Sequence, residues 1–362
     1  MSAVRLMNQA ADYEKLGVNP DHIEVWEDSK RVSSQADFWE WWYFDAILED
    51  GTAVVIQFLE KSFASIGKDN PKKGITFKIT LPDRTVYEEK LHIAAKDCYY
   101  GGDKCDVHYD KNFFVGDLKN YHIHVEQIGK IAADLHLESL ATPYRPGTAY
   151  FEFGDDQYYT WLCAVPKGRI SGTLTIDGKT IEVTGYGYHD HQWGKSPYIK
   201  HWNHWTWARQ SFDDYTLLVF DMTTTKDLGA KRFPLAFVED KNGKIIFENE
   251  DLINYQVLET QVDPASGKVY PKKTRYTFSG QGKEVTYTLE AKSTIESFGP
   301  KTMTFPQKLA MRALHLSNMS YSRFLGKGEM IIKDKGTEIK REGELIYEFM
   351  NPGKPSLELK SK

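Results

Sequence analysis

The chain of 362 residues carries a formal net charge of −5, with 41% hydrophobic, 14% aromatic and 27% charged positions. This length suits one large domain or two of ordinary size, and no apolar run approaches the roughly 20 residues that a transmembrane helix needs. The mild acidity argues against nucleic acid as a partner, and three cysteines without a CxxC motif indicate neither a disulfide framework nor a structural zinc site.

Residues 1–30 are predicted to form an N-terminal extension before the first domain. Residues 1–17 are mixed polar and acidic, without the basic and then apolar layout of a signal peptide. The sequence therefore predicts a cytoplasmic protein.

An aromatic strand is predicted next, in the run Phe38-Trp39-Glu40-Trp41-Trp42-Tyr43-Phe44-Asp45-Ala46. Side chains alternate along a strand, which divides this run into two faces. One face carries Glu40, Trp42 and Phe44, and the other carries Trp39, Trp41, Tyr43 and Asp45. One face is expected to fill the core while the other lines a cavity or a seam between domains. Simple packing of a strand in a barrel is the alternative.

Several segments of the first half alternate apolar and polar residues with a period of two. This alternation predicts strands at 75–81, 121–126 and 170–176. Asp177-Gly178 then predicts a tight hairpin turn into a strand at 179–183.

Histidine and tryptophan are concentrated between residues 185 and 209, in two runs. These are Gly185-Tyr186-Gly187-Tyr188-His189-Asp190-His191-Gln192-Trp193-Gly194 and His201-Trp202-Asn203-His204-Trp205-Thr206-Trp207-Ala208-Arg209. The favoured interpretation is a polar patch in an aromatic small-molecule pocket, because such pockets combine apolar walls with a few polar groups. A packed, hydrogen-bonded cluster is the structural alternative. A metal site at His189 and His191 is a third interpretation, but no metal is predicted because no further ligand follows at a familiar spacing.

The composition changes after Trp207, since every Trp and ten of the eleven His lie in the first 207 residues. This step predicts a first domain at 31–207 and a second at 208–352. The second domain is expected to contain hairpins at 236–247 and 276–289, a helix at 306–316 and closing strands at 328–349, before a polar tail at 353–362.

The predicted fold class is all-β. We expect two lipocalin-like antiparallel β-barrel domains, packed side by side and with few short helices, because short strands recur at regular spacing throughout the chain. A barrel of about eight strands can enclose one small ligand. A double sandwich is the alternative.

The runs Trp39–Asp45 and Tyr188–Gly194 together resemble the carotenoid 1,2-hydratase (hydroxyneurosporene synthase) superfamily. This superfamily includes fungal kievitone hydratase, lipocalin-like Diels–Alderases and AttH-like proteins, and the resemblance covers residues 30–350. It implies a pair of lipocalin-like barrels, a hydrophobic small-molecule substrate and no cofactor.

Within the hydratases, activity is linked to a His-x-Trp pair and to an aromatic-x-Asp on a following strand. The resemblance places the pair at His191 and Trp193, and the acid at Asp221. Val219 stands where a Tyr would be expected. This departure leaves room for a different substrate or reaction.

Each of these residues has a chemical role in hydrating an alkene, a reaction that begins with protonation of carbon. Asp221 lies in an apolar strand, where a buried carboxyl can keep its proton. The ring of Trp193 attracts a carbocation, and His191 can orient or deprotonate water. An ion pair of Asp221 with Arg209 or a Lys is the structural alternative. The predicted substrate-binding residues are Glu40, Trp41, Tyr43, Asp45, Tyr188, His189, His204, Trp205 and Trp207.

The predicted function is a cofactor-independent enzyme acting on a hydrophobic isoprenoid or polyene, by acid-triggered hydration of a C=C bond or a related isomerisation. A pericyclase or cyclase and a non-catalytic lipid carrier are the alternatives. Transient contact with a membrane is expected where the substrate is collected. The oligomeric state is left open.

Overall fold

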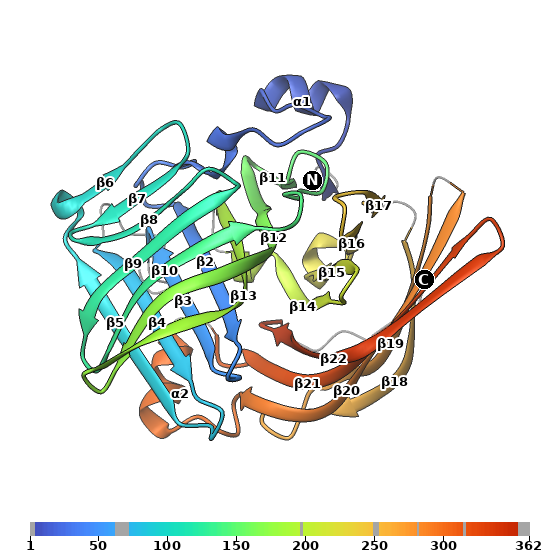
Figure 1. Ribbon diagram of the computed structural model, residues 1–362. Coiled ribbons are helices and arrows are strands. Elements are labelled where there is room, and N and C mark those ends of the chain that lie inside the picture. The colour runs from blue at the N-terminus through green and yellow to red at the C-terminus, as the bar shows by residue number, and fades with distance from the viewer. Residues whose placement is uncertain are drawn as a thin grey trace. The chain divides into compact units, whose positions relative to one another are not determined.

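The computed structural model describes residues 4–61, 72–195, 198–248, 253–280, 282–313 and 316–353. The chain divides into two compact units, Met1–Pro197 and Tyr198–Lys362, which we call unit 1 and unit 2. Each unit is built on its own antiparallel, barrel-like sheet (Figure 1). The predicted all-β class, with two barrel-like sheets and few short helices, is confirmed.

The described part of unit 1 forms a thirteen-stranded sheet in the order β5-β4-β3-β2-β13-β12-β10-β9-β8-β7-β6, with β1 and β11 attached beside β12. Its strands are β1 (Arg5–Leu6), β2 (Phe38–Leu48), β3 (Ala53–Leu59), β4 (Lys73–Thr80), β5 (Val86–Ile93), β6 (Cys98–Tyr100), β7 (Cys105–Tyr109), β8 (Asn112–Gly116), β9 (Asn120–Ile128), β10 (Ile131–Ser139), β11 (Tyr150–Gly154), β12 (Gln157–Ile176) and β13 (Lys179–Lys195). Its helical segments are α1 (Ala10–Leu16), η1 (Val25–Asp28) and η3 (Ala95–Asp97).

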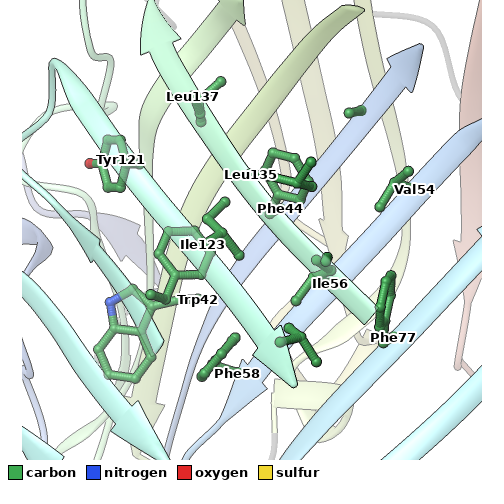
Figure 2. Close-up of a cluster of buried hydrophobic side chains, with 14 of the residues drawn as sticks. Trp42, Phe44, Val54, Ile56, Phe58, Phe77, Tyr121, Ile123, Leu135 and Leu137 are labelled. Carbon is green, nitrogen blue, oxygen red and sulfur yellow. The ribbon is translucent and has the colours of Figure 1, made fainter. Parts of the chain in front are cut away.

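The inside of the unit 1 barrel is filled by the inward-facing side chains of successive strands. Every second residue of a strand points to the same face, so Trp42 and Phe44 of β2 both face inward and are fully buried. Figure 2 shows them in one cluster with Phe58 of β3, Phe77 of β4 and Ile123 of β9. Burial of each such side chain stabilises the fold by roughly 1.5–3 kcal/mol, so these residues form a packed core.

The described part of unit 2 forms a nine-stranded sheet in the order β17-β16-β15-β14-β22-β21-β20-β19-β18. Its strands are β14 (Trp202–Ser211), β15 (Tyr215–Thr224), β16 (Arg232–Asp240), β17 (Ile245–Phe247), β18 (Ile253–Val262), β19 (Val269–Gly280), β20 (Lys283–Phe298), β21 (Ser320–Asp334) and β22 (Thr337–Asn351). Its helical segments are η4 (Tyr198–Lys200), η5 (Lys226–Leu228) and α2 (Phe305–Ala313). A second hydrophobic cluster lies inside this barrel.

The hairpins expected from local alternation are present. β12 and β13 pair across Asp177 and Gly178, whose φ angles of 51° and 79° are the left-handed values that a two-residue hairpin turn requires. The hairpins predicted at 236–247 and 276–289 are the β16–β17 and β19–β20 pairs, and β21 pairs with β22. Alternation and turn residues are local signals, which is why the sequence predicts these pairs.

The segments near the predicted boundary and the C-terminus complete the fold. β14 contributes to the sheet of unit 2. The helix predicted at 306–316 is α2, and residues 314–315 lie outside the described residues. Of the predicted tail at 353–362, only Gly353 belongs to the described residues. Among the residues that the structure describes, no helix has the length and apolar character needed to cross a bilayer.

Candidate functional site

Strands β2 and β13 carry the two motifs on which the family resemblance depends. They pair antiparallel, so that Trp42 lies opposite His191 and Tyr43 lies opposite Asp190. Because side chains alternate, the odd-numbered residues of β13 face the barrel interior and the even-numbered residues face outward. The two motifs therefore contribute side chains to two separate groups, one on each face of the sheet. We call them the inner cluster (Asp28, Lys30, Glu40, Glu60, His189 and His191) and the outer aromatic face (Trp39, Trp41, Tyr43, Asp45, Trp161, Tyr188, Asp190 and Gln192).

His191 lies at the centre of the inner cluster and is fully buried. Its Nε2 lies 3.0 Å from Glu40 Oε1, and its Nδ1 lies 3.2 Å from Asp28 Oδ1. The imidazole stacks on Trp42 at 4.6 Å between ring centroids and packs at the same distance against Trp193. Burial alone would lower the pKa of His191, but the contacts with Asp28 and Glu40 outweigh it and raise that pKa. His191 thus lies between two carboxylates, and both favour its protonated form.

Asp28 belongs to η1 and is a member of the inner cluster that the sequence analysis missed. Its Oδ2 accepts a hydrogen bond from Tyr121 at 2.7 Å and lies 3.1 Å from His189 Nε2. The other ring nitrogen of His189 donates to the Tyr43 carbonyl at 2.8 Å. Burial opposes ionisation of Asp28, yet His189 and His191 hold the pKa of Asp28 well below its ordinary value. The extension before β2 therefore supplies a buried charge to the barrel interior.

Glu40 and Glu60 share a lysine at the edge of the inner cluster. Lys30 Nζ lies 2.7 Å from Glu40 and 3.3 Å from Glu60. Glu60 also pairs with Lys73 and accepts hydrogen bonds from Ser34 and Tyr100. Burial acts to raise the pKa of both carboxyls, but the charge of Lys30 and the other donors lower both pKa values. These carboxylates stay ionised and hold the strands around them.

The outer aromatic face contains a carboxyl of a different kind, Asp190. Tyr188 donates to its Oδ2 at 2.8 Å, Trp161 Nε1 donates at 3.2 Å, and the amide of Gln192 donates to both oxygens. All of these donors are neutral. Burial raises the pKa of Asp190 to about 6, against the effect of the three donors. Asp190 can therefore carry a proton under mildly acidic conditions.

Aromatic side chains surround this carboxyl on the same face of the sheet. Trp39 and Trp41 stack at 4.5 Å, and Tyr43 lies edge-on to Tyr188 at 6.2 Å. The Tyr43 hydroxyl donates to Asp45 at 3.2 Å. Trp41, Tyr43 and Asp45 are partly exposed. Asp190, Tyr188, Trp161 and Trp39 of the same face are buried, so a ligand in contact with this face would meet Trp41, Tyr43, Asp45 and Gln192 first.

Asp221, the predicted acid, belongs to β15 of unit 2. Arg232 Nε donates to its Oδ1 at 2.7 Å, the Nη2 of the same guanidinium donates to Oδ2, and Tyr276 donates to Oδ2 at 2.8 Å. The sequence analysis offered Arg209 or a Lys as the ion-pair partner, and the structure shows Arg232 instead. A guanidinium that donates to both oxygens of a carboxylate forms strong, charge-assisted hydrogen bonds. This arrangement suits Asp221 for holding Arg232 and Tyr276 in place more than for donating a proton.

The remaining predicted residues of unit 2 lie on β14. His204 faces the barrel interior, where Nδ1 lies 2.9 Å from Asn203 Oδ1 and burial lowers the pKa of His204 to about 4. Trp205 and Trp207 lie on the opposite face and are partly exposed. The predicted residues of β2 and β13 thus belong to unit 1 but lie on its two faces, with Glu40, His189, His191 and Trp193 inward and Trp41, Tyr43, Asp45 and Tyr188 outward. His204, Trp205, Trp207 and Asp221 belong to unit 2.

Two groups of side chains among the described residues have donor atoms close enough to bind a metal ion together. The first is Asp28, Cys105 and His189 inside the unit 1 barrel. Because both ring nitrogens of His189 already face protein oxygens, this group is better explained as a hydrogen-bonded network. The second is His122, Asp134 and His136 on the outer surface of the same barrel.

Comparison with known proteins identifies the family. A model of the AttH-like family matches residues 29–295, more than half of the chain, so the chain belongs to the AttH-like family. It is 21% identical over 230 residues to the quinolone epoxide rearrangement protein asqO of Emericella nidulans, covering 60% of this chain and 62% of that protein. It is 22% identical over 256 residues to the Diels-Alderase mycB of Thermothelomyces thermophilus, covering 64% of this chain and 56% of that protein.

The chain therefore spans about 60% of the length of these curated relatives. Among solved structures, kievitone hydratase from Nectria haematococca is similar with a TM-score of 0.54 and 12% identity, covering 92% of this chain and 94% of that one. At this identity the likeness concerns the fold. The resemblance inferred from the two aromatic motifs is confirmed at the level of the family.

Proposed function

We propose that this protein is an enzyme that acts on a hydrophobic isoprenoid or polyene, by protonating a C=C bond and then adding water or shifting the double bond. The proposal uses no cofactor. It is supported by the names of the relatives, an epoxide rearrangement protein and a Diels-Alderase, and by the fold shared with a hydratase.

The observation that carries the proposal is the protonatable carboxyl of Asp190 within the outer aromatic face. A general acid works best when its pKa lies near the operating pH, and burial brings the pKa of Asp190 to about 6. Trp161, which donates to Asp190, and Trp41 on the same face have electron-rich rings, and such rings stabilise a cation by roughly 0.5–2 kcal/mol each. We assign Asp190 the delivery of the proton and the rings the stabilisation of the carbocation.

His191, Trp193 and Asp221 remain predicted catalytic residues and enter the proposal through their contacts. Because both nitrogens of His191 face carboxylates, we assign His191 the positioning of β13, which carries Asp190 on its opposite face. Asp221 is the second candidate for the acid. Of the predicted binding residues, Trp41, Tyr43, Asp45 and Tyr188 share the face of Asp190 and are proposed to contact the substrate.

A pericyclase or cyclase is the second candidate function, favoured by the relationship to a Diels-Alderase. Such an enzyme needs a shaped pocket that holds a flexible substrate in a reactive conformation, since fixing orientation lowers the entropic part of the barrier. One or two hydrogen-bond donors, such as Tyr188 or Trp161, would polarise a carbonyl. No proton is transferred to carbon in this case.

Isotope labelling with an acid-deficient variant tests the proposal. The protein is incubated with a panel of linear isoprenoids and polyenes in heavy-oxygen water, and the products are weighed by mass spectrometry. Hydration gives a product that carries the heavy oxygen, and isomerisation or cyclisation gives a product of unchanged mass. Asp190→Asn keeps the shape of the side chain but removes the acid, so we expect turnover to fall at least ~100-fold for hydration or proton-triggered isomerisation.

Asp177→Asn is the matched control, because Asp177 is an exposed carboxyl at the far end of the same hairpin. If turnover survives in Asp190→Asn but is lost in Asp221→Asn, the acid is Asp221 and not Asp190. A product of unchanged mass, formed equally well by both variants, favours the pericyclase. A substrate that quenches tryptophan fluorescence but is recovered unchanged indicates a lipid carrier.

We also propose a cytoplasmic location for the protein. Because isoprenoids partition into membranes, the protein is proposed to collect its substrate by transient contact with a membrane surface. Centrifugation of the protein with and without lipid vesicles that contain a polyene tests this part of the proposal.

A further inference from the structure

A histidine-rich group lies on the outer surface of the unit 1 barrel, away from the residues assigned above. His122 and His124 are on β9, and Asp134 and His136 are on β10. Ile123, between the two histidines, is fully buried in the barrel, so alternation directs His122 and His124 to the outer surface. All four side chains are at least partly exposed.

The register of the two strands places these residues in two adjacent cross-strand pairs. His122 lies directly opposite His136, and His124 lies directly opposite Asp134. Directly opposed side chains have Cβ atoms about 4.5–5.5 Å apart, within reach of a shared ligand. The four side chains therefore form a compact square on a hydrogen-bonded sheet, which holds their backbones in place.

The donor atoms already converge. One donor atom from each of His122, Asp134 and His136 lies within 4.8 Å of the other two. His122 Nε2 is 2.9 Å from Asp134 Oδ1, and the rings of His122 and His136 stack at 4.3 Å between centroids. Ligands of a tetrahedral zinc ion lie about 2.0–2.2 Å from the metal, so modest rotations of partly exposed side chains bring all three into coordination range.

We propose that His122, Asp134 and His136 bind a divalent first-row transition metal ion. Two imidazoles and one carboxylate are a recurrent ligand set for zinc that leaves a coordination position open to water. Imidazole ligands favour Zn²⁺, Co²⁺ and Cu²⁺ over Mg²⁺ and Ca²⁺, which prefer oxygen. The site should therefore bind Zn²⁺, Co²⁺ or Cu²⁺ and discriminate against Mg²⁺ and Ca²⁺.

His124, the fourth residue of the group, lies outside the proposed ligand set and contacts the ligand Asp134. His124 Nδ1 lies 2.7 Å from Asp134 Oδ2, the carboxylate oxygen that does not face His122. The ring of Phe113 packs against both His122 and His124, at 4.8 and 5.1 Å between centroids. Partners that orient a ligating carboxylate contribute about 10–100-fold to metal affinity.

Titration of the full chain with Co²⁺ and Zn²⁺ tests the site, using protein purified without a histidine tag. We expect Co²⁺ to give a saturable visible absorption band that Zn²⁺ displaces and that Mg²⁺ leaves unchanged. His122→Gln combined with His136→Gln should abolish the saturable binding, and His124→Gln should weaken it ~10–100-fold. Far-ultraviolet circular dichroism of each variant checks that the sheet is retained.

His22→Gln provides the matched control, since His22 is an exposed histidine of the same unit that is hydrogen-bonded to Glu24. Its Co²⁺ titration should match that of the unaltered chain. The proposal is overturned by saturable binding that survives in the His122 and His136 double variant, since this would put the metal elsewhere. Absence of saturable binding by the unaltered chain overturns it equally.

Discussion

At the scale of single residues, the buried carboxylates of this protein differ in the charge of their partners. Asp28 and Glu40 face His191, and Asp221 faces Arg232. The described hydrogen bonds to Asp190 all come from neutral groups, so burial is the main influence on its pKa and raises it. Ionisation therefore costs the folded state free energy at Asp190, whereas it is favoured at Asp28 and Glu40, whose pKa values are lowered.

Asp190→Asn should consequently change how stability depends on pH. The folded-state pKa of about 6 lies above the ordinary value of 3.8, so the folded state holds a proton that the unfolded chain releases. The stabilisation from this proton is complete below pH 3.8 and is lost as pH rises through 6. Relative to the unaltered chain, Asp190→Asn should gain about 2 kcal/mol of unfolding free energy between pH 4.5 and pH 8. Urea unfolding followed by tryptophan fluorescence measures this.

Asp177→Asn is expected to show no such gain, because hydrogen bonds from Lys130 and Tyr87 lower the pKa of Asp177 in the folded state. Any difference for that control should move in the opposite direction with pH. Parallel stability curves for Asp190→Asn and the unaltered chain would mean that Asp190 ionises as easily in the folded state as in the unfolded chain.

Of the residues in the candidate site, the sequence analysis included the aromatic and histidine runs and the carboxylates Glu40 and Asp45, but it did not include Asp28, Glu60 or Asp190. The runs around Trp41 and His191 are conspicuous because their composition is unusual over a short stretch. Asp28 lies 161 residues from His189, and nothing local distinguishes it from the neighbouring acids of the extension. Asp190 was visible within the run, and the period of two already separated it from His189 and His191, so alternation was the signal that could have identified it.

At the scale of elements, strands and hairpins follow from local periodicity, but the role of the N-terminal extension does not. The segment before β2 has no repeating pattern, yet it inserts Asp28 into the inner cluster and places Lys30 between Glu40 and Glu60. Glu27 also forms an ion pair with Arg145 at 2.8 Å. Residues 27–30 therefore act as part of the barrel, although the sequence suggested only an extension.

Two truncations test this role of the extension. Removal of residues 1–24 leaves the three charged partners Glu27, Asp28 and Lys30 in place, so unit 1 should still unfold cooperatively with a modestly lower Tm. Removal of residues 1–31 takes Asp28 away from buried His189 and His191 and takes Lys30 away from buried Glu40, while the contact between His191 and Glu40 remains. Loss of one partner from a buried ion pair costs about 3–5 kcal/mol, and several losses approach the total stability of a domain.

We therefore expect the longer truncation to lose the cooperative transition in near-ultraviolet circular dichroism. Asp28→Ala in the full chain should reproduce part of this loss, because it removes the partner of both histidines and of Tyr121. A longer truncation that melts like the shorter one would show that the inner cluster contributes little to stability.

At the scale of the whole molecule, each unit has its own sheet and its own buried ionic network. Unit 1 has the inner cluster, and unit 2 has Asp221 with Arg232 and Tyr276. The composition step in the sequence indicated two parts but could not show how the buried charges are divided, because ion pairs join residues that are distant in the chain. Arg232, for example, reaches Asp221 through the pairing of β15 with β16.

A double-mutant cycle tests whether the two networks are energetically separate. Glu40→Gln removes a carboxylate from His191 and Lys30, and Arg232→Met leaves Asp221 without its cation, so each should cost about 3–5 kcal/mol. Because the two sites share no partner among the described residues, their costs should add within ~0.5 kcal/mol. Tryptophan fluorescence reports more strongly on unit 1, which contains six of the nine Trp, and far-ultraviolet circular dichroism follows both units. A coupling energy above about 1 kcal/mol would mean that disrupting one network changes the stability of the other. The catalytic proposals for Asp190 and Asp221 would then have to be tested in combined variants as well as in single ones.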